Sequence, residues 1–472
     1  MRWRTANLNQ WRKSWMLSVL FLGIVASPGL AVNAMAAPGT LTEFPIPSGE
    51  PYPGTITSGS NDLWFTESYN AIYRIGRVTP DGQVTELSVP DFARGITQGP
   101  DGNIWFTMPG ANPTDPGKIG RMAPDGHIAE FTIATPDGHP MDITVGPDGD
   151  LWFTETSFAT AGVHGIGRIT TNGQITEFST LSPERHPEAI TAGPDGNVWF
   201  TDPGSSSQTP SEIGQITPSG EIIEFLIPGK GRPTSIVTGP DNNVWFTESN
   251  GKVGRITPRG KITEFSVPLN EYGGQRILGG ITSGFDGRLW IIDSAGGVLW
   301  RITPSGLITQ FKLPLESWPV GIAAGQDGNI WYTTWTGGFE GGGGTALAQP
   351  VKPGKVGRIT PDLWLDITNA RVSAVRTRTK LGLACQGGEK HSACSGQLRL
   401  SIRINSQARH RKTLILGYRS YTVSSGATRF VAVHLSHRAL VLLDRHPRLH
   451  MRVTATVRNG QTMSRRIILR RR

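Results

Sequence analysis

The sequence predicts an all-β chain, a seven-bladed β-propeller followed by a small Ig-like β-sandwich. A tryptophan-centred strand motif recurs seven times before residue 340, and turn dipeptides separate the short apolar segments around it. The charge balance then changes sharply near residue 361. A period of about 40–45 residues with four strands per unit is typical of a propeller. We therefore expect a propeller over residues 37–361 and a sandwich over residues 362–472.

The repeat is centred on a strand first seen at Leu63-Trp64-Phe65-Thr66-Glu67. Its tryptophans lie 41 to 47 residues apart, at Trp64, Trp105, Trp152, Trp199, Trp245, Trp290 and Trp331. Asp-Gly or Asn-Gly dipeptides separate four short apolar segments in each unit, and such dipeptides supply the positive φ that tight hairpins require. A sheet that is apolar on both faces must be covered by neighbouring sheets, which a ring of blades provides.

The outer-strand motif predicts how the ring closes. This motif appears first at Thr42-Glu43-Phe44, ahead of every repeat tryptophan, and it is missing after residues 357–361. We therefore expect the N-terminal strand to complete the last blade. Such pairing would remove the open sheet edges that a linear array of blades leaves.

Residues 1–36 have the order of a secretory signal peptide. Basic residues come first, an apolar run follows from Met16 to Ala26, and small residues end the segment at 34–36. The run of about 11 residues is shorter than the roughly 20 that span a bilayer. A retained membrane anchor is the alternative interpretation. We expect a secreted, extracellular protein.

The C-terminal segment differs from the ring in charge and in pattern. Residues 37–361 hold 20 Lys+Arg against 33 Asp+Glu, whereas residues 362–472 hold 22 against 4. Alternating apolar positions from Leu398 to Ile404 predict strands of a sandwich. The two cysteines, Cys385 and Cys394, both lie here, and we expect them to form a disulfide in an oxidising compartment.

The basic C-terminal segment has several candidate partners. An anionic cell-wall polymer, acidic lipid and nucleic acid are all compatible with its charge, and so are a solvated surface or a contact with the acidic ring. No aromatic residues interleave with its arginines at base-stacking spacing, so there is no specific nucleic-acid signal. We name an anionic cell-wall polymer as the candidate external partner, and we expect a monomer.

Motifs of strong catalytic chemistry are absent from the sequence. There is no HExxH, no phosphate-binding GxxxxGK[ST], no GxSxG and no calcium loop of the DxDxDG type. Asp148-Gly149-Asp150 comes nearest to the calcium loop. Because the equivalent residues of other repeats are ordinary Pro-Asp-Gly turns, we interpret it as a turn.

The repeats GxIT-xGPDG-x-[LIV]WFTE and IGRITPxGxITEF resemble those of the streptogramin B lyases, also called virginiamycin B lyases. The resemblance covers about 320 residues, which is the whole ring. It implies a seven-bladed propeller closed by its N-terminal strand. It also implies eliminative opening of an ester in a cyclic depsipeptide antibiotic, with a histidine base and a magnesium ion held by acids.

The resemblance does not extend to the positions that carry this chemistry. Trp318 stands in place of an acid, Val320 in place of the base, Gly279 in place of a second histidine, and Trp335 in place of a magnesium ligand. Val320 and Gly279 occupy equivalent positions, where the first strand of their blades begins. In the other five blades this opening position is filled by Gly54, Arg94, Met141, Glu188 and Thr234. The resemblance therefore implies the family's fold for this chain but does not imply the family's activity.

A different polar group lies on the same predicted face, around the third blade. Three of the four ring histidines are expected in its loops, namely His139, His164 and His186. Candidate binding residues near them are Asp142, Glu155, Glu188, Asp202 and the opening residue Arg94. Nitrogen and oxygen ligands of this kind suit a metal or a polar ligand. The alternative is a set of exposed loop histidines at unrelated positions.

Two functions are compatible with these features. The first is a non-catalytic binding or scaffold propeller that presents its loop-rich face to an unidentified peptide, glycan or protein. The alternative is a carbon–oxygen lyase acting on a cyclic depsipeptide or similar ester, with a relocated histidine and acid site and magnesium as its cofactor. The glycine-rich loop at 334–355 belongs to the same face and is either a lid or an unstructured segment.

Overall fold

The computed structural model describes residues 40–471, with gaps at 50–51, 111–114, 158–164, 181, 183–184, 207, 230, 269–275, 295–296, 315–316, 337–351, 362–363, 368–370, 376–377, 387–392, 406–410, 425–427, 437–438, 441, 443–447 and 458–461. The expected signal peptide, His164 and most of the glycine-rich loop lie outside the described residues. Within them, no helix has the length and apolar character needed to cross a membrane.

The described residues from Leu41 to Ile359 form seven four-stranded antiparallel sheets. In each sheet the first-named strand is the inner one and the last-named strand is the outer one. The first three are β2 (Tyr52–Ser58), β3 (Leu63–Tyr69), β4 (Ile72–Val78), β5 (Val84–Ser88); β6 (Ile96–Gln98), β7 (Ile104–Met108), β8 (Lys118–Met122), β9 (Ile128–Thr132); and β10 (Gly138–Val145), β11 (Leu151–Ser157), β12 (Gly165–Ile169), β13 (Ile175–Ser179).

The next three sheets are β14 (Ile190–Ala192), β15 (Val198–Asp202), β16 (Glu212–Ile216), β17 (Ile222–Leu226); β18 (Pro233–Thr238), β19 (Val244–Glu248), β20 (Lys252–Ile256), β21 (Ile262–Ser266); and β22 (Leu278–Ser283), β23 (Leu289–Asp293), β24 (Val298–Ile302), β25 (Ile308–Lys312). The last sheet is β26 (Ser317–Ala324), β27 (Ile330–Thr336), β28 (Lys352–Ile359), β1 (Leu41–Pro45).

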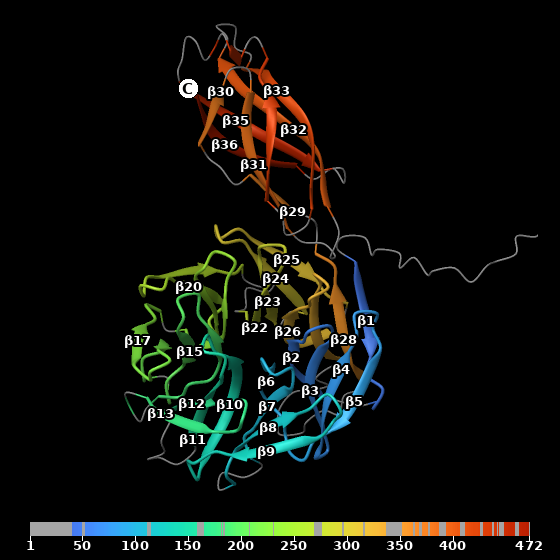
Figure 1. The fold of residues 1–472 in the computed structure, drawn as a ribbon, viewed down its shortest axis with the longest axis vertical. Helices are drawn as coiled ribbons and strands as arrows, with labels where there is room; N and C mark the ends of the chain where they lie inside the picture. Colours follow the sequence, from blue (N-terminus) through green and yellow to red (C-terminus); the bar gives the residue numbers. More distant parts are fainter. Residues whose placement is uncertain are drawn as a thin grey trace, which may run out of the picture. The chain divides into compact units, whose positions relative to one another are not determined.

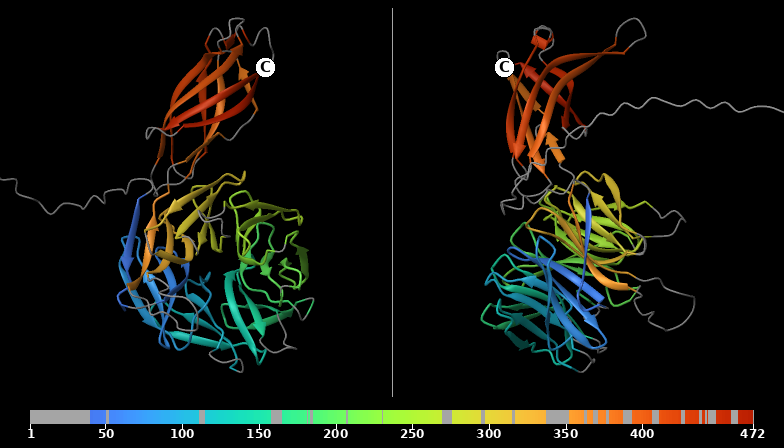
Figure 2. Two further views of the ribbon diagram at one scale, coloured as in Figure 1. Left: turned by 180° about the vertical axis from the view of Figure 1, so that it is seen from behind. Right: turned by 90° about the vertical axis from the view of Figure 1, so that its right-hand side faces the viewer.

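The inner strands of successive sheets contact one another in a closed circle. The order of contact is β2, β6, β10, β14, β18, β22, β26 and then β2 again. Figure 1 shows the sheets arranged around a common axis, and the view from behind in Figure 2 shows the same ring. A circle of antiparallel sheets with radial strand order is a β-propeller.

The N-terminal strand closes the ring as expected. Strand β1 pairs antiparallel with β28, from Leu41 opposite Ile359 to Pro45 opposite Lys355. The Phe44 ring stacks on Trp331 with 5.8 Å between ring centroids. The last sheet therefore combines three strands from the C-terminal end of the ring with one strand from its beginning, and β1 covers the edge of β28 that would otherwise be unpaired.

The repeated Pro-Asp-Gly and tryptophan positions are linked by a hydrogen bond. The Trp245 indole N–H donates to Asp241, four residues earlier, at 2.9 Å. The same bond forms at Trp105, Trp152, Trp199, Trp290 and Trp331. At Asp148-Gly149-Asp150 it joins Trp152 to Asp148 at 3.0 Å, and Gly149 has a φ of 84°. This segment is therefore the turn that the repeat predicts.

Threonines of the repeated Trp-aromatic-Thr motif bridge neighbouring blades. The Thr154 hydroxyl accepts from the Asp142 amide at 3.1 Å and donates to the Glu188 carbonyl of the next sheet at 2.7 Å. Equivalent bonds run from Thr107 to Met141, from Thr247 to Gly279 and from Thr333 to Gly54. These bonds fix the opening residues of the inner strands at the axis.

The C-terminal segment is also all β. Its strands are β29 (Trp364–Ile367), β30 (Arg371–Val375), β31 (Arg378–Gln386), β32 (Ala393–Asn405), β33 (Arg411–Ser424), β34 (Thr428–His434), β35 (Arg448–Val457) and β36 (Thr462–Arg471). They form one eight-stranded hydrogen-bonded sheet, with β30 and β36 parallel and the other pairs antiparallel. The Ig-like sandwich stays a prediction. So does the disulfide, because the side chains of Cys385 and Cys394 lie outside the described part.

Candidate ligand-binding site

A cavity of about 390 Å³ lies at the axis of the ring, where the inner strands begin. Its size falls within the range of about 300–1,000 Å³ that is common for small-molecule sites. All seven sheets contribute, through Thr55, Ile56, Thr57, Arg94, Gly95, Ile96, Thr97, Met141, Asp142, Ile143, Thr144, Glu188, Ala189, Ile190, Thr234, Ser235, Ile236, Gly279, Gly280, Ile281, Val320, Gly321 and Ile322.

Irregular pairing at the start of the inner strands places the opening residues at the cavity. The register of β10 on β11 skips from Pro140 to Ile143, and that of β26 on β27 skips from Pro319 to Ile322. The same interruption occurs in β2, β18 and β22. A bulge bends its strand and changes the direction of the extra residues. Six of the seven opening positions line the cavity, the exception being Gly54.

One wall of the cavity carries charge, and Asp142 lies at its centre. Its two carboxylate oxygens accept from the amides of Ile143 at 2.9 Å and Ile190 at 3.0 Å. Burial raises the pKa of Asp142 to about 6, although these two N–H groups and Arg94 oppose the shift. Because Ile190 belongs to the next sheet, Asp142 also joins two blades.

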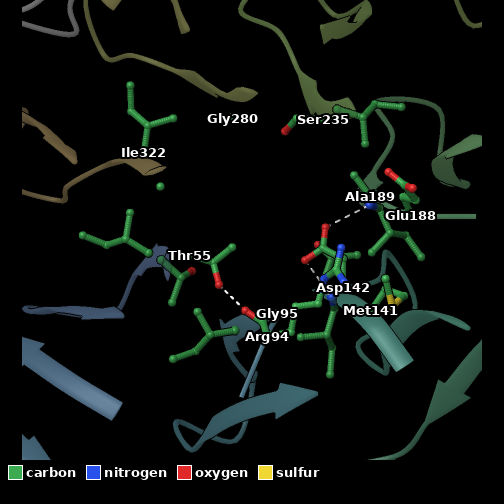
Figure 3. Close-up of a pocket in the computed structure, with 18 of the residues that line it drawn as sticks. Thr55, Arg94, Gly95, Met141, Asp142, Glu188, Ala189, Ser235, Gly280 and Ile322 are labelled. Atoms are coloured by element: carbon green, nitrogen blue, oxygen red, sulfur yellow. Dashed lines mark hydrogen bonds between the residues drawn. The ribbon is translucent and has the colours of Figure 1, made fainter. Parts of the chain in front are cut away.

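Glu188 and Arg94 extend this charged wall on either side. Burial raises the pKa of the Glu188 carboxyl above its ordinary value, while Arg94 and Arg232 act in the opposite direction. Arg94 is exposed, and it is the only basic residue among the described residues that line the cavity. Its guanidinium makes no ion pair within the described part of the chain. In Figure 3 it points into the cavity beside Asp142.

The opposite wall is apolar. Gly279 and Gly280 of β22 contribute only backbone, and Val320 and Ile322 of β26 contribute aliphatic side chains. Val320 keeps 40% of its surface exposed, which is unusual for an aliphatic residue at the centre of a fold. Figure 3 shows Gly280 and Ile322 across the cavity from Asp142 and Glu188. A ligand would therefore meet charge on one side and hydrocarbon on the other.

The two described histidines of the third-blade group do not line the cavity. His139 lies in β10 rather than in a loop, because this strand begins at Gly138, and the residue is buried with Nδ1 against the Pro109 carbonyl. His186 is half-buried, and its backbone N–H donates to Asp202 at 3.1 Å. Burial lowers the pKa of the His186 imidazole, and the nearby Asp202 opposes this shift. The structure thus places these side chains apart from the charged wall.

The acids of the group divide between the cavity and the blade interiors. Asp142 and Glu188 lie in the cavity with Arg94, whereas Glu155 and Asp202 are buried inside their sheets. Burial raises the pKa of Glu155 to about 7, and the neighbouring Glu177 adds to this shift. Asp202 accepts from the Gly204 amide at 2.8 Å.

The residues that replace the expected magnesium site do not suit a metal. Trp318 and Trp335 are cross-strand partners whose rings stack with centroids 5.7 Å apart, and Tyr52 packs edge-on against Trp335 at 6.2 Å. Magnesium requires oxygen ligands in near-octahedral geometry, which these rings do not supply. Among the described residues, no group of three or more His, Cys, Asp or Glu side chains is placed to hold a metal.

The ring of sheets around its axial cavity defines a β-propeller. The chain belongs to the virginiamycin B lyase family, which it matches over residues 29–205 and 94–342. The cavity lies where the opening positions of that family's repeats converge, and in this chain those positions hold different residues.

Solved structures agree with this membership. Virginiamycin B lyase from Staphylococcus aureus, solved as a catalytically inactive variant with quinupristin, is 31% identical with a TM-score of 0.55, covering 67% of this chain and 98% of its own. A streptogramin B lyase structure is 30% identical with the same TM-score, covering 67% and 97%. A fungal alcohol oxidase in complex with copper is 11% identical at a TM-score of 0.50 and covers 92% and 99%, which shows likeness of fold alone. No curated protein sequence matches the chain.

Proposed function

We propose that this chain is a secreted seven-bladed propeller, spanning residues 37–361, that binds a ligand in its axial cavity without catalysing a reaction. One observation carries the proposal: a charged wall remains in the cavity, while Trp318, Val320, Gly279 and Trp335 occupy the positions of the family's catalytic chemistry. A ligand site is thus retained where the reactive groups are not.

The chemistry of ester elimination supports the same conclusion. A general base must reach the proton that it removes, and it must accept that proton near the working pH. The Val320 side chain accepts no proton, and Gly279 has no side chain. A lyase that used a relocated histidine as its base would need that histidine on the cavity wall, and neither His139 nor His186, the two described histidines of the third-blade group, lines that wall.

The proposal is tested with quinupristin, the compound present in the related structure. The full chain and, as a positive control, the Staphylococcus aureus lyase are each incubated with quinupristin and magnesium, and the products are followed by mass spectrometry. We expect the antibiotic to stay cyclic with this chain and to be linearised by the control enzyme. Linear product at a rate similar to the control would overturn the non-catalytic proposal and favour the lyase.

We further propose that residues 1–36 are a signal peptide and that residues 362–472 form a basic, Ig-like module that attaches the monomeric protein to an anionic cell-wall polymer. The high density of Lys and Arg in this segment supports electrostatic attachment, which salt would weaken. Pull-down on cell-wall material across a salt series is expected to show binding that falls with salt. Retention that does not change with salt would contradict electrostatic attachment.

We also propose a disulfide between Cys385 and Cys394. Intact mass measured with and without reductant tests this bridge.

A further inference from the structure

The two walls of the axial cavity differ in chemistry, and together they specify a ligand. Arg94, Asp142 and Glu188 supply both signs of charge on one side. Gly280 and Ile322 lie on the other side in Figure 3, and Val320 completes this apolar wall. Binding pockets commonly combine an apolar lining with a few polar groups that fix orientation.

Arg94 is suited to bind a carboxylate. Its backbone is held in place, since its amide donates to the Thr107 carbonyl at 3.0 Å and its carbonyl accepts from the Thr55 hydroxyl. The guanidinium itself has no ion-pair partner in the described part of the chain. A planar guanidinium presents paired N–H donors that match the two oxygens of a carboxylate. A ligand carboxylate would therefore act as the ion-pair partner of the Arg94 guanidinium.

Asp142 and Glu188 are suited to bind an ammonium group. Each Asp142 oxygen accepts a single backbone N–H, from Ile143 or from Ile190. An ionised carboxylate has about four acceptor sites, so both oxygens retain acceptor capacity toward the cavity. Arg94 acts electrostatically on both acids. A ligand with adjacent positive and negative groups could thus contact both kinds of side chain together.

The apolar wall offers room for a hydrocarbon side chain. A Cβ built on Gly279 would meet no atom nearer than 3.5 Å, whereas one on Gly95 would lie 2.7 Å from the Asp142 Cα. Close packing therefore requires glycine at residue 95 but not at residue 279. Behind this wall, Ile292 takes the place of the bridging threonine of other blades and is fully buried. The contact between β22 and β26 is therefore more apolar than the equivalent contacts that contain the bridging threonine.

We propose that the cavity binds a zwitterionic α-amino acid with an apolar side chain. Its carboxylate lies on Arg94, its ammonium group on Asp142 and Glu188, and its side chain against Val320 and Ile322. A simple carboxylate would pair with Arg94 but would bring no positive group to the two acids beside it, and a simple amine would leave the Arg94 guanidinium without an ion-pair partner. This inference rests on the proposed binding function and names the ligand class for the same site.

The first test is calorimetric titration of the full chain with four matched probes. L-Leucine has both charges, N-acetyl-L-leucine lacks the ammonium group, L-leucinamide lacks the carboxylate, and glycine lacks the side chain. We expect leucine to bind about tenfold or more tightly than N-acetyl-L-leucine and L-leucinamide, as loss of one charge-assisted contact implies. We also expect it to bind more tightly than glycine, which has no side chain to bury against the apolar wall. Absence of leucine binding, or equal binding of leucinamide or N-acetyl-leucine, would overturn the inference.

Substitutions then assign each charge. Arg94→Gln is expected to bind leucine no better than leucinamide, and Asp142→Asn no better than N-acetyl-leucine. Because the Asp142 side chain also joins two blades, Glu188→Gln provides a second variant, at a side chain that makes no such bond between blades.

Gly279→Leu tests the apolar wall. It is expected to fill the apolar side of the cavity and weaken leucine binding without loss of folding. Arg259→Gln, on an exposed turn, is the control and should bind like the parent. Unchanged binding by Arg94→Gln would contradict the assignment.

Quinupristin separates failure of this inference from failure of the proposed function. If the chain binds quinupristin intact but does not bind leucine, the amino-acid ligand is wrong and the non-catalytic binding function stands. If the chain linearises quinupristin, the proposed function is wrong. If leucine binds with the expected charge dependence and quinupristin stays cyclic, both are supported.

Discussion

Replacing Trp199 with alanine is expected to lower the free energy of unfolding by about 3–5 kcal/mol, the usual cost of truncating a buried aromatic residue. Trp199 is 0% exposed, stacks on Phe225 at 5.6 Å, and donates its indole N–H to Asp195 at 3.1 Å. It also packs with Val244 and Phe246 of the following sheet. The substitution would therefore leave a cavity between two blades as well as within one.

Urea unfolding of the parent and of Trp199→Ala measures this loss directly. Phe285→Ala is a suitable control, because Phe285 is 50% exposed and its truncation should change the unfolding free energy only slightly. Equal stability of the parent and Trp199→Ala would mean that the repeated tryptophan does not pack as the structure shows.

Stability is expected to fall as the pH rises from about 5 to 8, and Glu67→Gln is expected to remove a large part of that fall. Glu67 is only 3% exposed, and burial next to Glu86 raises its pKa from 4.5 to about 8. Glu67 Oε2 and Glu86 Oε1 are both buried, and neither has a hydrogen-bond partner among the described residues. A proton shared by the two carboxyl groups would join them.

The sign follows from proton linkage. The folded state holds the Glu67 proton more tightly than the unfolded chain does, so its contribution is complete below about pH 4.5 and is lost as the pH rises through 8. The loss is on the order of 3–5 kcal/mol. Burial also raises the pKa of Glu155 and of Glu248 to about 7, so these groups add to the same slope.

Unfolding free energies of the parent and Glu67→Gln at several pH values between 5 and 8 measure the difference. Glutamine stays neutral at every pH, so the variant should be the more stable protein at pH 8 and should show a shallower slope. Glu221→Gln, at an exposed turn, is the control and should keep the parent slope. A variant with the full parent slope would contradict the shared-proton assignment.

The repeat alone was sufficient to predict the ring. Trp64 and its six equivalents set the spacing of the units, and Thr42-Glu43-Phe44 indicated the closing strand that pairs with β28. These predictions succeeded because each blade uses the same contacts, so the pattern recurs in the chain. The C-terminal sheet has no such repetition, and its strand order, including the parallel pair β30 and β36, could not be read from alternation.

The candidate site was predicted in part. Arg94 was named because it occupies the opening position, and Asp142 and Glu188 because they lie close in sequence to the third-blade histidines; all three line the cavity. Strand periodicity does not say whether a side chain points to the axis, so Glu155 and His139 were grouped with them although both are buried within the third blade.

The apolar wall was missed for a different reason. Gly280 and Ile322 carry no distinctive chemistry, and only the ring brings them opposite Asp142. Gly279 and Val320 were noted only as replacements of the family's catalytic residues, and the replacement of the repeated threonine by Ile292 was a further sequence signal at this wall.

The most direct test of the axial site is a crystal structure of the full chain grown with saturating L-leucine. We expect density for the amino acid inside the ring, with its carboxylate on Arg94, its ammonium group on Asp142 or Glu188, and its side chain toward Val320. An empty cavity at saturating leucine, or leucine bound only at another face of the molecule, would contradict the proposed site.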